Sequence, residues 1–298
     1  MTAVVRNVLV GSSLRPASDR VVGSALALAR AAGARLHVAH AFPPLVPYVG
    51  EPFPVQWISP DLEAENERAL AAQLREQAQR VGATEHELGT VTLACGVAHD
   101  VLAETTAAVG ADVLVVGGRE LEGGRHFLLG STTDRVLRRT RCPVLVLHGE
   151  PRFPPRTVVL PVDLSPLSAA AFGWATRFLA QLDRDRTLSG QALFVLLPFT
   201  AQLALQFDAQ QVESLARTEL QRIIDRSGEL ASRIQPVLRT GEPRTEILAH
   251  LERERPDLAV IATHSRAGLD RLLIGSVAAE VARAAPSSVL VVPPPADA

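Results

Sequence analysis

Short apolar runs alternate with longer amphipathic segments along the whole chain. Runs such as VLVV and VLVL are apolar at consecutive positions, which is typical of strands buried on both faces of a parallel sheet. In the first half the pattern predicts strands over 5–11, 35–41, 88–94, 112–117 and 143–147, and helices over 18–32, 60–81, 98–109 and 131–140. In the second half it predicts strands over 156–162, 191–197, 234–239, 258–262 and 288–292. This alternation predicts an α/β fold with helices on both faces of a parallel sheet.

The second half of the chain repeats the first. Three pairs of residues are separated by the same 145 positions: Asp112 and Asp257, Gly130 and Gly275, and Val144 and Val289. The first strands also match, with 156–168 standing 150 positions after 6–18. A period of this length indicates duplicated domains rather than a solenoid. We expect a first copy over 1–149 and a second copy over 155–298, joined by the Pro-rich linker HGEPRFPPR.

Composition and motifs narrow the possible functions. All 30 basic residues are Arg, so a P-loop with its Lys and a Schiff-base Lys are both excluded. A formal net charge of −2 argues against non-specific binding to nucleic acid. The sequence contains no HExxH or Cys/His cluster for a metal, and no G-x-S-x-G elbow for a hydrolase. The N-terminus resembles a strand rather than a signal peptide, and no apolar run is long enough to cross a membrane. We therefore expect a cytoplasmic protein that does not contact a membrane.

Two stretches of the second copy resemble the universal stress protein family. These are VVLPVDLSPLSAAAFGWA at 158–175 and THSRAGLDRLLIGSVAAEVARAAPSSVLVVP at 263–293, and the likeness extends to both copies. The resemblance implies two tandem five-stranded parallel sheets with strand order 3-2-1-4-5, similar to the adenine nucleotide alpha hydrolase fold. It also implies pairing of the copies through their last strands. Many members bind ATP through Gly-x2-Gly-x9-Gly-Ser/Thr, with an Asp that ends the first strand and lies near the ribose.

The second copy keeps part of this implied ATP site. Its matching positions are Pro161, Val162, Asp163, His264, Gly275, Ser276 and Val277. Ala262 and Ser265 stand at the first two glycine positions. Both residues are small, so the loop retains room for a phosphate, at a cost of roughly 1–2 kcal/mol if either position needs a positive φ. Mg²⁺ could enter with the nucleotide, held mainly by its phosphates.

The first copy departs from the motif in a different way. Gly117, Gly130 and Ser131 match its first and last parts, whereas Glu120 replaces the second glycine and Ser13 replaces the Asp. A carboxylate beside a triphosphate is repulsive unless a metal lies between them. The second copy is therefore the better candidate for an adenine nucleotide site, and the first copy a degenerate one.

Other functions remain open from the sequence. The Gly-Ser steps could serve only as helix caps, and the protein would then be a nucleotide-independent interaction or structural module. A slow ATPase is a third hypothesis, for which the sequence identifies no base that would activate water. Two chains could also form a homodimer. The Pro-rich segment 42–60 could cover a pocket, contact a partner or simply pack as a stiff loop.

Overall fold

The computed structural model describes residues 4–43, 60–120, 127–128, 130–198, 209–263 and 274–294. Most of the Pro-rich segment, at 44–59, lies outside these ranges, as do His264 and Ser265. The predictions for these residues are therefore not tested by the structure.

The first copy forms a five-stranded parallel sheet. Its strands are β1 (Asn7–Gly11), β2 (Arg35–Phe42), β3 (Leu88–Cys95), β4 (Val113–Gly117) and β7 (Val144–Leu147). They lie in the order β3-β2-β1-β4-β7, with every neighbouring pair parallel. This is the order 3-2-1-4-5 that the resemblance implies for one domain.

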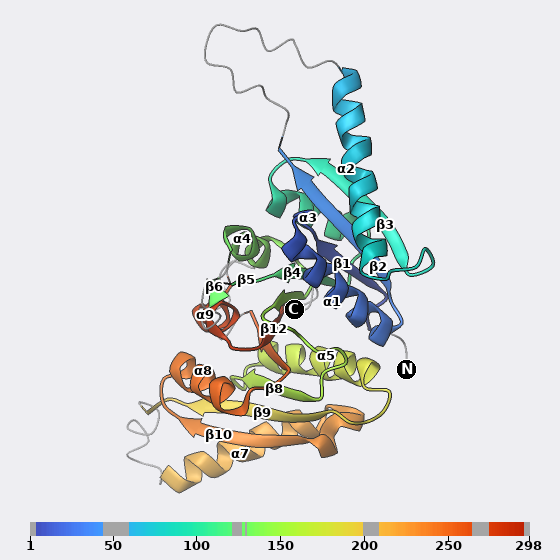
Figure 1. Cartoon of the computed structure of the whole chain (residues 1–298). Coiled ribbons are helices and arrows are strands. Elements are labelled where there is room, and N and C mark those ends of the chain that lie inside the picture. The colour runs from blue at the N-terminus through green and yellow to red at the C-terminus, as the bar shows by residue number, and fades with distance from the viewer. Residues whose placement is uncertain are drawn as a thin grey trace, which may run out of the picture.

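The second copy repeats the arrangement. Its strands are β8 (Thr157–Val162), β9 (Ser189–Leu196), β10 (Ile234–Thr240), β11 (Leu258–Ala262) and β12 (Ser288–Val292), in the order β10-β9-β8-β11-β12. The last strands of the two copies, β7 and β12, pair antiparallel, with Leu145 opposite Leu290. The ten strands thus form one sheet (Figure 1), and the α/β class and strand order predicted from the sequence are confirmed.

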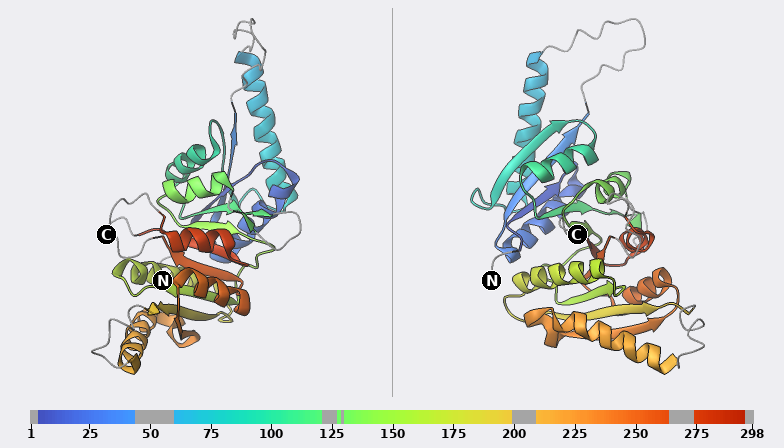
Figure 2. Two further views of the ribbon diagram at one scale, coloured as in Figure 1. Left: turned by 90° about the vertical axis from the view of Figure 1, so that its left-hand side faces the viewer. Right: turned by 180° about the vertical axis from the view of Figure 1, so that it is seen from behind.

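Helices cover both faces of this sheet (Figures 1 and 2). One face carries α1 (Pro16–Ala32), α2 (Pro60–Arg80), α5 (Pro166–Leu182), α7 (Ala209–Asp225) and the 3₁₀ helix η2 (Gly228–Arg233). The other carries α3 (Ala98–Ala108), α4 (Ser131–Arg139), α8 (Pro243–Glu254) and α9 (Ser276–Ala284). Each face has one hydrophobic core that includes residues of both copies, because successive strand residues point to opposite faces.

Local sequence explains where these helices begin and end. Pro166 opens α5, and the Ser165 hydroxyl accepts a hydrogen bond from the Ser168 N–H at 3.1 Å. Helix α1 also opens with a proline, and it ends at Gly33, whose φ of 66° is left-handed. The boundaries of α1 and α5 therefore follow from signals that the sequence itself carries.

The Gln181 side chain of α5 forms hydrogen bonds with the backbone of the first copy. The Gln181 Oε1 accepts hydrogen bonds from the N–H groups of Val4 and Val5 at 2.9 and 3.0 Å. Its Nε2 donates to the carbonyls of Val5 and Ala32, both at 2.7 Å. Gln181 thus satisfies backbone groups at the start of the first copy from a helix of the second.

The loop after β4 in the first copy contains a feature that the sequence did not predict. Two short strands, β5 (Arg119–Glu120) and β6 (Phe127–Leu128), pair antiparallel as a separate two-stranded sheet. Strand β6 contacts α9 of the second copy. The loop that resembles a phosphate-binding segment in the first copy therefore also takes part in the contact between the copies.

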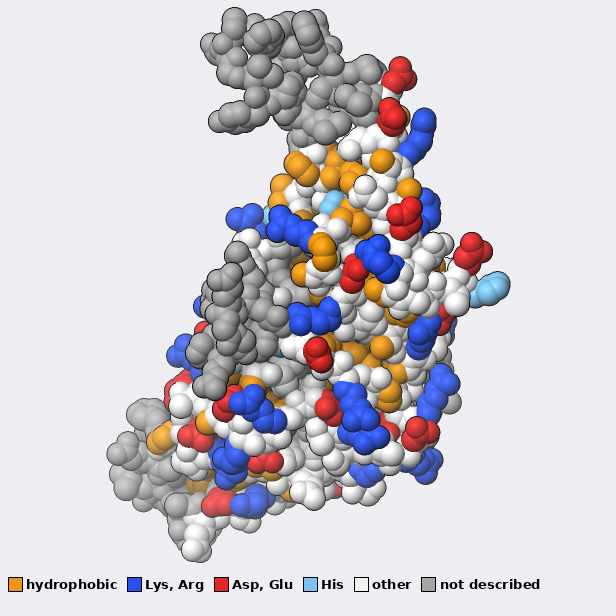
Figure 3. Space-filling model, in the orientation of Figure 1, with side chains coloured by type: hydrophobic (Ala, Val, Ile, Leu, Met, Phe, Trp, Pro, Cys, Tyr) orange, Lys and Arg blue, Asp and Glu red, His pale blue; other side chains and the backbone are white. Residues whose placement is uncertain are grey.

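The surface carries charges of both signs. On the face shown in Figure 3, acidic and basic side chains are intermingled rather than separated into a basic field. None of the helices in the described ranges is long and apolar enough to cross a membrane.

Candidate functional site

The candidate site of the second copy lies where β8 and β11 end. These strands are parallel neighbours, so their carboxyl ends lie at one edge of the sheet. Pro161 and Val162 are the last two residues of β8, and Asp163 follows directly; Ala262 is the last residue of β11. The fold therefore brings these four predicted residues to the same edge.

The Asp163 carboxylate is half-buried and organises the turn into α5. Its Oδ1 accepts a hydrogen bond from the Ser165 N–H at 2.9 Å, and its own N–H donates to the Ser168 hydroxyl at 3.2 Å. Leu164, between them, has a left-handed φ of 62°. Among the residues that the structure describes, Oδ2 of Asp163 has no hydrogen bond. One carboxylate oxygen is thus used by the turn, and the other is available to a ligand hydroxyl.

The amino end of α9 faces the same edge. Gly275 precedes the helix and Ser276 is its first residue, and no side chain of the described residues caps the first turn. The Gly275 N–H donates to the Thr263 carbonyl at 2.6 Å, which holds the helix start beside the end of β11. Backbone N–H groups in an uncapped first turn, together with the helix dipole, favour an anion. Ser276 is exposed, and Val277 is half-buried behind it.

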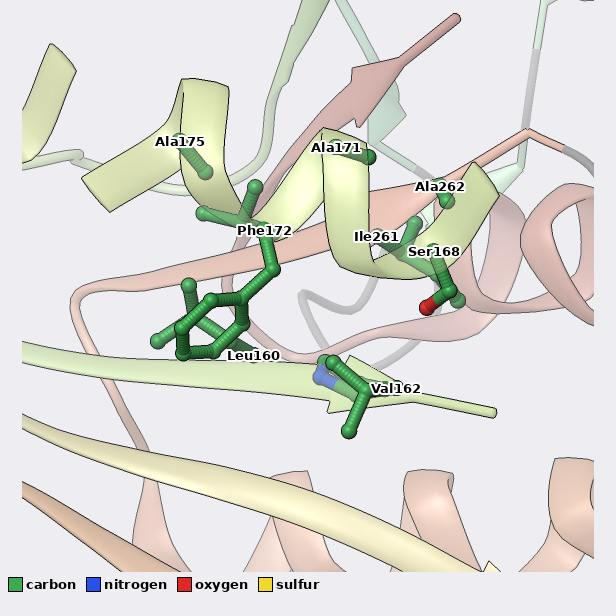
Figure 4. Close-up of a pocket in the computed structure, with 10 residues that line it drawn as sticks. Leu160, Val162, Ser168, Ala171, Phe172, Ala175, Ile261 and Ala262 are labelled. Carbon is green, nitrogen blue, oxygen red and sulfur yellow. The ribbon is translucent and has the colours of Figure 1, made fainter. Parts of the chain in front are cut away.

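A small gap lies beneath this edge, between α5 and the ends of β8 and β11 (Figure 4). Phe172 projects from α5 towards β8 and is only 3% exposed. About 10 Å³ of the gap is open to the centre of a water molecule, roughly the space that one water needs. This gap is too small for an adenine ring, so a nucleotide would lie above it, on the edge itself.

Ala262 shows why the two copies differ at the first glycine position. In the first copy, a Cβ at Gly117 would lie 2.9 Å from Cγ2 of Val21 on α1. In the second copy the residue in place of Val21 is Ala171, and Ala171 and Ala262 line the same gap. Gly117 is absent from the residues with positive φ. The difference between Gly117 and Ala262 therefore reflects the volume of the neighbouring side chain. Ala262 does not have a left-handed backbone, so it carries no conformational cost.

The first copy has a polar network at the position of Asp163. Ser13 is exposed, and its neighbour Ser12 is buried with its hydroxyl donating to Gln77 Oε1 on α2 at 2.5 Å. The Gln77 Nε2 donates in turn to the Ser18 hydroxyl at 2.9 Å and to Asp19 at 2.7 Å. Gln77 is 1% exposed and ties α2 to the turn after β1, and the carboxylate of this network, Asp19, is already paired with Arg80.

The first copy nevertheless assembles the ends of its glycine motif. Gly117 ends β4, Gly130 precedes α4 and Ser131 is its first residue, again with no side-chain cap. The Thr133 hydroxyl donates to the Gly117 carbonyl at 3.2 Å, which links the helix start to the strand end. The predicted residues of each copy that the structure describes are thus brought together at the carboxyl edge of that copy's sheet.

Two residues near the candidate sites, one in each copy, were not predicted from the sequence. Thr263 holds the start of α9 through its carbonyl, and its N–H donates to the Val292 carbonyl at 2.9 Å. Gln77 closes the network of the first copy. Backbone bonds such as those of Thr263 leave no sequence signal, and a Gln on an amphipathic helix resembles a surface residue.

Comparison with known proteins assigns the chain to a family. The sequence profile of the universal stress protein family matches residues 5–148 and again 155–293. The chain therefore belongs to the universal stress protein family, with two family domains in tandem.

Two of the similar proteins match this chain over nearly its whole length, and a third matches about half of it. A universal stress protein of Mycolicibacterium smegmatis is 27% identical over 98% of this chain and 99% of its own length. A solved universal stress protein of Archaeoglobus fulgidus has a TM-score of 0.67 at 15% identity, and the match covers 98% of this chain and 99% of that one. A universal stress protein solved in complex with cAMP is 30% identical over 48% of this chain and 97% of its own, with a TM-score of 0.34.

Proposed function

We propose that the second copy binds ATP or a related adenine nucleotide, and that the protein acts by binding rather than by turnover. The observation that carries the proposal is the uncapped first turn of α9, held by the Gly275–Thr263 hydrogen bond at the edge where Asp163 leaves β8. The backbone N–H groups of Ser276 and Val277, in the first turn after Gly275, would receive the phosphates. The free Oδ2 of Asp163 would accept a hydrogen bond from a ribose hydroxyl. We keep the boundaries 1–149 and 155–298 as the proposed limits of the two domains.

The loop residues complete the proposed site. Ala262 is small enough for the backbone to approach a phosphate, and His264 and Ser265 would line the loop that follows. Mg²⁺ would enter with the nucleotide and be held mainly by its phosphates. The part of the chain that the structure describes holds no group of three or more His, Cys, Asp or Glu side chains able to bind a metal by itself.

Equilibrium binding of ATP to the purified full chain tests the proposal. We expect saturable binding below millimolar ATP, abolished by Gly275→Glu because a carboxylate would then lie at the phosphate position. The matched control is Gly130→Glu in the first copy, which should keep the affinity of the wild type. Binding that survives Gly275→Glu and is lost in Gly130→Glu would place the nucleotide in the first copy and overturn the assignment.

A nucleotide-independent role is the second candidate, and it applies to the first copy. The Ser12–Gln77–Ser18 network lies where the second copy has Asp163, and β6 contacts α9. On this view the first copy serves as a structural module that supports the second. Binding measured at saturation distinguishes the two: one ATP per chain supports this view, and two ATP per chain contradict it.

A further inference from the structure

A larger cavity lies at the opposite edge of the second sheet, beside the linker. Its volume is about 230 Å³, against about 10 Å³ for the gap under Asp163. It is lined by the linker residues 148–152, by 255–257 before β11 and by 286–288 at the start of β12. We call it the linker cavity. Because it lies at the amino ends of β11 and β12, it is separate from the candidate nucleotide site at their carboxyl ends.

One residue of the linker cavity has an unfavourable backbone conformation. Arg255 follows α8 with φ 47° and ψ 53°, in the left-handed region that residues with a Cβ avoid for steric reasons. The residue in its place in the first copy is Gly110, with φ 58°. Glycine ends a helix in this way without strain. The duplicated fold therefore accommodates Gly at this turn, and the second copy has an Arg there despite the strain, which is a common feature of functional sites.

The charges around the linker cavity include an arginine without a partner. Arg152 is exposed, and among the described residues it forms no ion pair or hydrogen bond. Arg255 is bonded only within its own helix end, to the carbonyl and the carboxylate of Glu252. Buried Ser287 also lines the cavity, and its hydroxyl has no hydrogen-bond partner in the part of the chain that the structure describes.

Two carboxylates line the same cavity, and one of them is already engaged. The Asp257 Oδ2 accepts hydrogen bonds from the N–H groups of Arg156 and Thr157 at 2.7 and 3.0 Å. Asp112 makes the same pair of bonds in the first copy, with Arg6 and Asn7, so this role belongs to the fold. Glu150 lies exposed in the linker. The cavity lining thus includes two arginines, of which Arg255 is paired with Glu252, and one exposed carboxylate, Glu150.

We propose that the linker cavity binds a small oxyanion of the phosphate or sulfate class between Arg152 and Arg255. Guanidinium groups present paired N–H donors that match the oxygens of such an anion. Because Arg152 belongs to the linker and Arg255 to the end of α8, the bound anion would fix the linker against the second copy. The proposal does not depend on nucleotide binding.

Thermal unfolding in phosphate, compared with chloride at the same ionic strength, tests this site. The measurement uses the full chain carrying Gly275→Glu, which removes the candidate anion site at the start of α9. At phosphate about tenfold above its dissociation constant, we expect the Tm to rise by about 2–3 °C. Arg152→Ala should abolish this rise and leave the Tm in chloride unchanged. The control Arg75→Ala removes an exposed arginine from α2 and should keep the rise.

The variant Arg255→Gly tests the backbone strain at this position separately from the binding of the anion. It restores the residue of the first copy, so we expect a higher Tm in chloride and no further rise in phosphate. A lower Tm in chloride would show that Arg255 stabilises the end of α8, which would remove the reason for the proposal. The proposal would be overturned if phosphate did not raise the Tm of the parent protein. It would also be overturned if the rise in Tm persisted in both Arg152→Ala and Arg255→Gly.

Discussion

At the scale of single residues, small differences in volume separate the two copies of the site. Gly117 in the first copy faces Val21, whereas Ala262 in the second faces the smaller Ala171. A glycine in a motif is often attributed to a ligand that approaches the backbone. Here the neighbouring helix already accounts for Gly117, so the glycine alone is no sign that the first copy binds a phosphate.

The Gly117 contact gives a first prediction. Gly117→Ala places a Cβ 2.9 Å from the Val21 side chain, so we expect it to lower the free energy of unfolding by about 1–3 kcal/mol. Val21→Ala removes the obstructing methyl groups, so the double variant should recover most of the loss caused by the added Cβ. Urea unfolding of both single variants and the double variant measures the interaction. Additive losses would show that the two side chains do not compete for space.

Buried His37 gives a second prediction, on pH. Burial lowers its pKa below the usual 6.5, with a further contribution from the charge of Arg35. Its Nδ1 accepts the Thr90 N–H at 3.0 Å, and its Nε2 lies 3.2 Å from Asn7 Oδ1, a pattern that the neutral ring satisfies. As the pH falls, the unfolded chain takes up this proton before the folded chain does. The stabilisation is therefore full above about pH 6.5 and decreases below it.

Unfolding free energies at pH 7.5 and 5.5 test the role of His37. We expect the loss between these values to be smaller in His37→Asn, which can accept and donate the same hydrogen bonds but does not titrate. His86→Asn, at an exposed position, is the matched control and should behave as the wild type. Equal losses in His37→Asn and the wild type would contradict the prediction.

The sequence predicted where the candidate residues lie better than it predicted why these residue types occur there. Asp163, Ala262, Gly275 and Ser276 meet at one edge because each follows or precedes a strand or helix that the apolar pattern locates. The contact between Gly117 and Val21 depends on how closely α1 packs on the sheet. Such a distance cannot be obtained from residue types alone.

At the scale of elements, the connection from α5 to β9 depends on one buried carboxylate. The Asp183 Oδ1 accepts hydrogen bonds from the N–H groups of Thr187 and Leu188 at 2.8 and 3.1 Å, and its Oδ2 pairs with Arg233 of η2. The Asp183 side chain is 2% exposed and that of Arg233 is 23% exposed. The ion pair is therefore largely shielded from solvent, unlike the exposed pairs of the helices.

Removing this carboxylate gives a third prediction. Asp183→Ala leaves two backbone donors and a largely buried guanidinium without their acceptor, so we expect unfolding to become easier by about 3–5 kcal/mol. The control Glu213→Ala breaks an exposed pair with Arg217 within α7 and should change stability by less than about 1 kcal/mol. Chemical denaturation of the two variants makes the comparison. A loss in Asp183→Ala no larger than in the control would show that water replaces the carboxylate.

Most elements followed from the periodicity of the sequence. The predicted strand 258–262 and helix 98–109 agree with β11 and α3 to within a residue, because consecutive apolar runs and helical spacing are strong signals. The β5–β6 pair was not predicted. Arg119–Glu120 and Phe127–Leu128 are only two residues each, and their pairing arises beside α9 of the other copy.

At the scale of the whole molecule, the contacts between the two copies are those of a single folding unit. Strands β7 and β12 join the sheets, and both hydrophobic cores include residues of each copy. The resemblance already implied the pairing of the last strands, whose apolar edges would otherwise be exposed templates for association. The cross-copy bonds of Gln181 could not be predicted, because they depend on how α5 lies against the start of β1.

A fourth prediction concerns cooperativity. Because no core is confined to one copy, we expect a single thermal transition with equal calorimetric and van't Hoff enthalpies. Gln181→Leu leaves the Val4 and Val5 N–H groups without their acceptor, so it should lower the stability of the whole chain by about 1–3 kcal/mol and keep one transition. Gln221→Leu, which removes only an exposed bond to Asp225, is the control and should leave the Tm within about 2 °C. Two transitions, of which Gln181→Leu shifted only one, would show that the copies unfold separately despite their shared sheet.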